Sequence, residues 1–256
     1  MKIQINKTTI LLTTLMCLSL MSCREKTKPI VEGPTVTDID GNKYKSVRIG
    51  KQIWMAENLR TTRFRNGAEI PYITSNQDWK EKTSSAQCTY ENTTNPELIK
   101  KFGRLYNEYA LLDTNIVAPL GWHIPTDKEW LELEDFVAFN SGNAASFGTA
   151  LAGSSDWIST SRFGTTHLNL EETNTQKGFE INTLGFTALP TGIRDMFDGS
   201  FRSKGELSSM WSKSGRNYTI YSSTYHHRGR ISYILDFYFR GINKKSLGTS
   251  IRCIKD

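Results

Sequence analysis

The hydrophobic positions after Pro125 follow the period of a helix. Apolar residues recur at helical spacing there and acidic residues lie between them, which places the two kinds on opposite faces. Thr126 and Glu129 have the Thr-x-x-Glu spacing of a capping box, in which each side chain binds the backbone amide of the other residue. This pattern predicts a capped helix of roughly four turns that ends at 140–142. Its core stripe is Trp130, Leu133, Phe136 and Val137, and its solvent side carries Glu132 and Asp135.

A second helical pattern begins at Asn95-Pro96-Glu97, because proline suits the first turn of a helix. The stripe continues to Leu112, with Gly103 as a weak point inside it. We interpret its aromatic residues as core rather than as a cofactor site. The sequence therefore predicts two helices joined by residues 113–121. The apolar stripe is Leu98, Phe102, Leu105, Tyr106, Tyr109 and Leu112.

Short segments on either side of the helices predict β-strands. Early ones are bounded by the turn sequences Asp40-Gly41-Asn42 and Gly50-Lys51, and late ones are rich in β-branched and aromatic residues. The polar stretch 59–95 has no clear period and is predicted to be an irregular surface excursion. Two helices followed by many short strands predict one α+β domain over residues 36–256. The predicted strands are 36–39, 43–49, 52–57, 218–221, 231–239 and 250–254.

The first residues have the layout of an export signal. Two lysines precede an apolar run from Ile10 to Leu20, which is shorter than the ~20 residues of a membrane-spanning helix. The run ends in Leu20-Met21-Ser22-Cys23, which resembles a bacterial lipobox. That resemblance implies removal of residues 1–22 as a lipoprotein signal peptide and acylation of Cys23, with polar residues 23–35 as a tether. The alternative is an ordinary signal peptide or simple anchor with an incidental cysteine, and both alternatives predict export.

Export leaves Cys88 and Cys253 as the cysteines free to pair, since Cys17 lies in the signal and Cys23 takes the lipid. In an oxidising compartment two such cysteines most simply form a disulfide. A bridge closing so long a loop would contribute roughly 4–5 kcal/mol in the chain-entropy model. The alternative is two buried free thiols.

Composition and motifs disfavour several function classes. The formal net charge of +6 is dispersed, which argues against nucleic acid as a partner. No glycine-rich nucleotide motif and no serine-nucleophile elbow is present. Asp38, Asp40 and Asn42 only faintly resemble a calcium loop, because the glycine is misplaced and Ile49 stands where a glutamate is needed. We therefore predict no metal and no cofactor, and favour a non-catalytic protein.

The histidines do not form a metal-binding or catalytic pattern. None has the spacing of a zinc-binding motif, and adjacent residues of a strand point to opposite faces, so His226 and His227 cannot chelate one ion together. We interpret His123 as a structural group whose hydrogen bonds are satisfied. The four histidines are His123, His167, His226 and His227.

Six runs occur in a recognisable order along the chain. They are Trp54-Met55-Ala56-Glu57-Asn58-Leu59, Phe102-Gly103-Arg104-Leu105-Tyr106-Asn107, Gly121-Trp122-His123-Ile124-Pro125-Thr126, Gly148-Thr149-Ala150-Leu151, Gly185-Phe186-Thr187-Ala188-Leu189-Pro190-Thr191-Gly192 and Ser250-Ile251-Arg252-Cys253-Ile254-Lys255-Asp256. Together they resemble the Fibrobacter succinogenes major paralogous domain, found in exported proteins and lipoproteins of Bacteroidetes-like bacteria.

This resemblance implies a C-type-lectin-like fold, which also underlies the formylglycine-generating, sulfatase-modifying enzymes. In that fold two helices flank a small irregular antiparallel sheet, and the two termini meet as neighbouring strands. The resemblance implies no activity.

The candidate ligand face lies in the aromatic and arginine-rich segment 216–240. Tyrosine and arginine give a recognition surface large contact area for few lost rotamers. In an alternating strand Tyr233, Leu235, Phe237 and Phe239 share one face, and we expect them in the core. The predicted ligand-binding residues are Tyr218, Tyr221, Tyr225, His226, Arg228 and Arg230.

The sequence as a whole predicts an exported, lipid-anchored binding or adhesion module of the cell envelope, held to the membrane through Cys23. An extracellular glycan is slightly favoured over a protein as its ligand. Two alternatives stay open: an enzyme related to the formylglycine generators, and a purely structural envelope or assembly component. The residues after the anchor, Arg24-Glu25-Lys26, hint at display on the outer-membrane surface.

Overall fold

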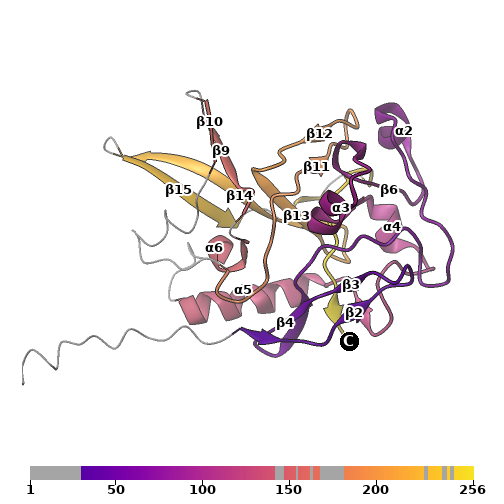
Figure 1. The fold of residues 1–256 in the computed structure, drawn as a ribbon, viewed down its shortest axis with the longest axis horizontal. Helices are drawn as coiled ribbons and strands as arrows, with labels where there is room; N and C mark the ends of the chain where they lie inside the picture. The colour runs from indigo at the N-terminus through magenta and orange to yellow at the C-terminus, as the bar shows by residue number, and fades with distance from the viewer. Residues whose placement is uncertain are drawn as a thin grey trace, which may run out of the picture.

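The computed structural model describes residues 30–141, 147–153, 155–161, 164–167, 182–227, 230–237, 241–242 and 245–256, and these fold into a mixture of helices and small antiparallel sheets (Figure 1). For 141, 147, 159–161, 164–167, 221–227, 230–237 and 241–242 the description covers the backbone alone. The predicted mixed α and β class is confirmed.

The main sheet joins the beginning of the domain to its end. Its strand order is β1-β4-β5-β17-β8, so the last strand lies between two strands from the first half of the chain. Ile254 pairs with Trp54 on one side and with His123 on the other. The resemblance implied that the two termini meet as neighbouring strands. The last strand shares a sheet with the first, but β4 and β5 lie between them. The strands are β1 (Val31–Glu32), β4 (Ser46–Ile49), β5 (Gln52–Met55), β8 (Trp122–His123) and β17 (Ile254–Lys255).

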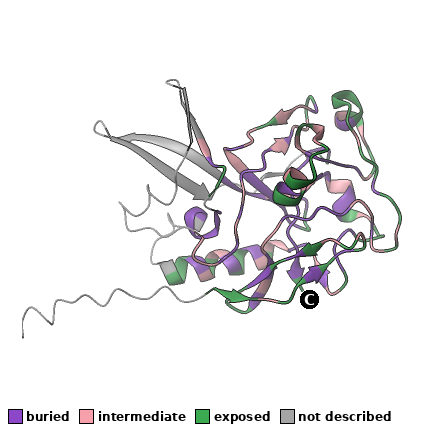
Figure 2. Cartoon of the chain, viewed as in Figure 1, coloured by how far each residue is buried: buried purple, intermediate pink, exposed green. Residues whose placement is uncertain are grey.

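Helix α5 (Asp127–Ser141) forms where the periodicity predicts it. The capping box is present: the Thr126 amide donates to Glu129 Oε2 at 2.8 Å, and the Glu129 amide donates to Thr126 Oγ1 at 3.3 Å. Trp130, Leu133 and Val137 are buried, whereas Glu132 and Asp135 are exposed (Figure 2).

The second predicted helix is interrupted, so the prediction of one helix up to Leu112 is wrong. Helix α3 (Pro96–Phe102) ends at Gly103, and a short strand β7 (Leu105–Tyr106) separates it from α4 (Glu108–Leu112). Gly103 has φ +76°, and a Cβ there would lie 2.6 Å from the Cβ of Asn58. Close packing against another segment therefore breaks the helix at the residue that the sequence marks as weak.

The excursion 59–95 is more ordered than predicted. It contains α2 (Asn76–Glu81), β6 (Gln87–Cys88), which pairs with β7, and a 3-10 turn η1 (Tyr90–Asn92). Trp79 is the buried residue of α2, and its Nε1 donates to the carbonyl of Ser246 at 2.7 Å. One buried residue on a six-residue helix leaves no period to detect in the sequence.

Among the described residues, all the elements after α6 (Phe147–Leu151) are strands, as predicted for the end of the chain. A four-stranded sheet contains β13 (Leu207–Trp211), β14 (Arg216–His227), β15 (Arg230–Phe237) and β16 (Gly241–Ile242). The β14–β15 hairpin extends away from the body of the domain (Figure 1). The remaining elements are α6 (Phe147–Leu151) and the pairs β2 (Val36–Thr37) with β3 (Lys43–Tyr44), β9 (Ile158–Ser161) with β10 (Gly164–His167), and β11 (Ile193–Arg194) with β12 (Phe201–Arg202).

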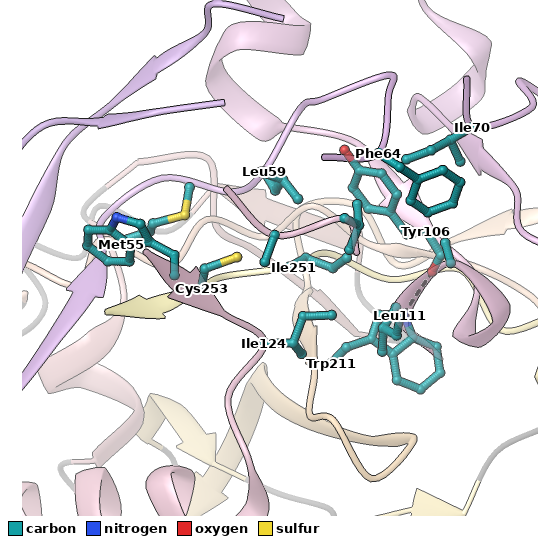
Figure 3. Close-up of a cluster of buried hydrophobic side chains, with 14 of the residues drawn as sticks. Met55, Leu59, Phe64, Ile70, Tyr106, Leu111, Ile124, Trp211, Ile251 and Cys253 are labelled. Carbon is teal, nitrogen blue, oxygen red and sulfur yellow. Dashed lines mark hydrogen bonds between the residues drawn. The ribbon is translucent and has the colours of Figure 1, made fainter. Parts of the chain in front are cut away.

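The described residues form two large apolar clusters. One gathers Trp54, Trp130 and Phe186 between the main sheet, α5 and the β-rich half. The other, shown in Figure 3, includes Met55, Leu59, Tyr106, Trp211 and Ile251. Within it the indole Nε1 of Trp211 donates to the carbonyl of Tyr106 at 2.7 Å.

Phe102 and Tyr106, which periodicity assigned to the core, are buried, whereas Tyr109 is half-buried and Leu112 is exposed. The side chains of Tyr233, Leu235 and Phe237, and the whole of Phe239, lie outside the described residues.

The predicted disulfide is wrong, because Cys88 and Cys253 are both free. Cys88 packs with Trp79 and Leu105 in a third cluster, whereas Cys253 packs in the cluster of Figure 3. Both thiols are buried, and burial raises the pKa of Cys88 to about 12 and that of Cys253 further. The pairing of β17 with β5 keeps Cys253 in a different cluster from Cys88 of β6, so the alternative of two buried thiols is what the fold adopts.

Candidate functional site

Tyr218, predicted to be exposed on the ligand face, is a core residue. Its side chain is 0% exposed, and its ring stacks on that of Trp130 with centroids 4.7 Å apart and an interplanar angle of 14°. Its hydroxyl donates to the carbonyl of Asp127 at 3.4 Å. The prediction fails because the first part of β14 packs over α5, so this tyrosine cannot contact a ligand.

The other predicted ligand residues lie on the hairpin. Tyr221, Tyr225 and His226 belong to β14, and Arg230 begins β15 opposite His227. Their side chains, and the whole of Arg228, lie outside the described residues. Their role stays a prediction.

His123 is held between two carboxylates, as expected of a structural group. Its Nδ1 lies 2.7 Å from Asp256 Oδ1, and its Nε2 lies 2.8 Å from Glu129 Oε1. Glu129 is also the capping residue of α5, so the imidazole links the start of that helix to the C-terminal residue. Both ring nitrogens are engaged, which leaves neither to activate a nucleophile.

The structure reveals a pocket that the sequence did not indicate. It has a volume of about 470 Å³ and opens between the loop before α2, the β6 strand and helix α3. Ile70, Pro71 and Ile99 give it an apolar part. This volume lies in the range of small-molecule sites. The polar lining includes Glu69, Tyr72, Gln87, Thr89, Thr94 and Arg104.

Arg104 is fixed in the wall of this pocket by neutral acceptors. Its Nη1 donates to Gln87 Oε1 at 2.8 Å, and its Nε donates to the carbonyl of Arg60 at 3.1 Å. Gln87 is buried and is itself oriented by donating from Nε2 to the carbonyl of Ile70 at 3.3 Å. The guanidinium therefore has a defined position before any ligand arrives.

Tyr72 is the aromatic group of the pocket. Its ring is 40% exposed and its centroid lies 5.7 Å from Cζ of Arg104. Its hydroxyl lies 2.8 Å from Oγ1 of Thr89, which donates onward to the carbonyl of Thr93 at 2.8 Å. The Tyr72 ring, the Arg104 guanidinium and the Thr89 hydroxyl, each fixed by hydrogen bonds, therefore line the same pocket.

The pocket residues escaped sequence analysis because they come from separate short elements. Tyr72, Gln87 and Thr89 fall in the stretch interpreted as an irregular excursion, and Arg104 follows the helix break at Gly103. The pairing of β6 with β7 and the bridge between Tyr72 and Gln87, both set by tertiary contacts, bring them together.

The described residues contain neither a metal-binding cluster nor a membrane-spanning helix. No three or more His, Cys, Asp or Glu side chains gather there closely enough to hold a metal ion. None of the helices in those ranges combines the length and apolarity needed to cross a bilayer.

Comparison with known families shows to which family the chain belongs. The family model described as the Fibrobacter succinogenes major domain matches residues 47–255. The chain belongs to this family. None of the curated proteins or solved structures compared with the chain matches it.

Most of the runs that carry the resemblance to this Fibrobacter succinogenes major domain form the scaffold, and Arg104 of the second run also lines the pocket. Buried Arg252 donates from Nε to Asn58 Oδ1 at 2.8 Å, and from its two terminal nitrogens to the carbonyls of Phe186 and Thr187. Asn58 in turn donates to the carbonyl of Phe102 at 2.9 Å. Four of the six runs therefore bind one another directly.

Proposed function

We propose that this chain is a non-catalytic binding module of the cell envelope, with a glycan as its preferred ligand and a protein as the alternative. The observation that carries the proposal is the open pocket of about 470 Å³ in which an exposed tyrosine ring, threonine hydroxyls and a held guanidinium meet. Aromatic faces stack on the apolar faces of sugar rings, and fixed polar groups orient their hydroxyls.

Export and lipid attachment form part of this proposal. The apolar leader and the Leu20-Met21-Ser22-Cys23 sequence support cleavage before Cys23, acylation of that residue, and a tether, predicted over 23–35, whose residues 31–32 already pair with β4 as strand β1. Display on the outer-membrane surface would bring the pocket to extracellular ligands.

A C-type-lectin-like fold is likewise proposed. Its support is the placement of β17 between β5 and β8, which puts the first and last strands in one sheet, together with the capped helix α5.

A binding screen with the full chain tests the proposed function. We expect the chain, purified in detergent, to bind a subset of immobilised glycans, and Tyr72→Ala to weaken that binding by about tenfold through loss of the ring. Alanine substitutions at Tyr221 and Tyr225 measure how much the β14–β15 hairpin contributes to glycan binding. A blank glycan array together with stoichiometric capture of a protein partner would replace the glycan by a protein ligand, and turnover of a bound molecule would contradict a non-catalytic role.

A further inference from the structure

We propose that the Arg104 pocket binds a saccharide that carries a carboxylate, such as a uronic acid, with Arg104 as the anchor of the carboxylate. This inference rests on the proposed glycan-binding function and adds the charge class of the ligand and the residue that selects it.

Arg104 combines a charge that no carboxylate pairs with in the described part of the chain and a position in the wall of a pocket. Its guanidinium is half-buried, lines a pocket and makes no ion pair in the described part of the chain. Four other arginines lie within ion-pair distance of a carboxylate, namely Arg60, Arg63, Arg202 and Arg216. Arg65, Arg194 and Arg252 give their side-chain hydrogen bonds to carbonyl oxygens and side-chain amides of the folded chain.

The geometry of Arg104 leaves donors for a ligand. A guanidinium has five N–H donors, and the two bonds to Gln87 and to the carbonyl of Arg60 use two of them, so three remain. These include both hydrogens of Nη2. A planar guanidinium whose rotamer is already fixed matches a carboxylate with little further loss of entropy. The pocket therefore presents a preformed receptor for one negative group.

The surroundings of Arg104 favour a saccharide over an acidic peptide as the carrier of that group. The Tyr72 ring offers an apolar face beside the cation, and it is held by the hydrogen bond between its hydroxyl and Thr89. The exposed Glu69 at the pocket is an acceptor for ligand hydroxyls, which sugars have in abundance. A second carboxylate of an acidic peptide would meet the negative charge of Glu69 instead.

The test compares ligands that differ only in the carboxylate. The full chain in detergent is titrated with a galactose oligosaccharide that carries a single galacturonate residue, with the methyl ester of that residue and with the neutral galactose oligosaccharide of equal length. We expect the acid to bind at least about tenfold more tightly than its ester, because a charge-assisted bidentate contact is lost in the ester. We also expect the advantage of the acid to shrink as salt is raised.

Variants assign that preference to Arg104. We expect Arg104→Met to remove the preference for the acid, and Arg104→Lys to retain only part of it because lysine lacks the planar fork. Arg48→Met removes the same charge from an exposed position on β4 outside the pocket, and it should leave the preference intact. Thermal unfolding identifies any variant that has lost its fold, and the ester comparison on the unchanged chain stands without variants.

The outcomes separate this inference from the proposed function. Equal binding of acid, ester and neutral oligosaccharide would overturn the role of Arg104 and leave a glycan-binding module. Binding of an acidic peptide but of no saccharide would overturn both. A preference for the acid that survives Arg104→Met would move the carboxylate site elsewhere on the chain.

Discussion

At the scale of single residues, buried arginine side chains link segments of this protein by hydrogen bonds. The sequence suggested that a disulfide would provide such a link. Arg194 is buried between the rings of Trp79 and Phe201, with Cζ at 4.5 and 4.7 Å from their centroids. It donates to the carbonyl of Gly199 at 2.9 Å and to that of Thr74 at 2.8 Å. A guanidinium with all its acceptors in place can tie two loops together without a disulfide.

The free thiols give a prediction at the same scale. Both are fully buried, and burial raises the pKa of each, so the thiolate is scarce and shielded at neutral pH. We expect neither Cys88 nor Cys253 of the native chain to react with a thiol reagent, and both to react once the chain is unfolded in guanidinium without reductant. Mass spectrometry after labelling measures this, and an unfolded chain that labels only after reduction would restore the disulfide.

At the scale of elements, the start of α5 joins local and tertiary interactions. Burial alone would raise the pKa of Glu129, but hydrogen bonds from the Thr126 amide and from His123 outweigh it and hold the pKa below its ordinary value of 4.5. The carboxylate form is therefore favoured by folding. Its contribution is fully present above pH 4.5 and is lost as the pH falls through the lower folded-state pKa.

This cap predicts a pH-dependent loss of stability. We expect Glu129→Gln to lower the free energy of unfolding by about 0.5–1 kcal/mol at pH 7, and the difference from the unchanged chain to vanish in acid. Urea unfolding from pH 3 to 7 measures it. Glu132→Gln, on the exposed face of the same helix, serves as the matched control and should show no such dependence. A constant difference across that range would assign the effect to packing rather than to charge.

At the scale of the whole molecule, the fold depends on contacts between segments far apart in the chain. The β17 strand lies between β5 and β8, and the Met55 amide donates to the carbonyl of Cys253 at 2.9 Å. Arg252, one residue away, holds Asn58 and the carbonyls of Phe186 and Thr187. The beginning, the middle and the end of the domain therefore stabilise one another at one place.

The contacts of Arg252 predict that replacing this one residue strongly lowers the stability of the fold. Burial lowers the pKa of the Arg252 guanidinium, and its oxygen acceptors offset the cost of burying the charge. Arg252→Met would leave two buried acceptors and one part-buried acceptor without this donor, and we expect it to lower the free energy of unfolding by roughly 3 kcal/mol. Denaturant midpoints measure the loss. Arg48→Met, on the exposed surface, should change the free energy of unfolding by less than about 0.5 kcal/mol. An equal loss of stability in the two variants would contradict the structural role of Arg252.

The sequence by itself determined the parts of this protein that rest on local physics. The Thr126–Glu129 cap and the stripe of Trp130, Leu133 and Val137 specify α5, because helix capping and periodic burial depend on neighbours within a few residues. The turn at 40–42 is likewise specified locally, since backbone conformations with positive φ favour glycine.

Only the tertiary structure decided which residues share a surface. Tyr218 and the tyrosines at 221 and 225 look equivalent in sequence, yet packing over α5 buries Tyr218. Cys88 and Cys253 look like partners, yet strand pairing assigns them to different clusters. The pocket of Tyr72, Gln87 and Arg104 has no sequence signal, because strand register and long-range burial, which no local spacing records, place its side chains together.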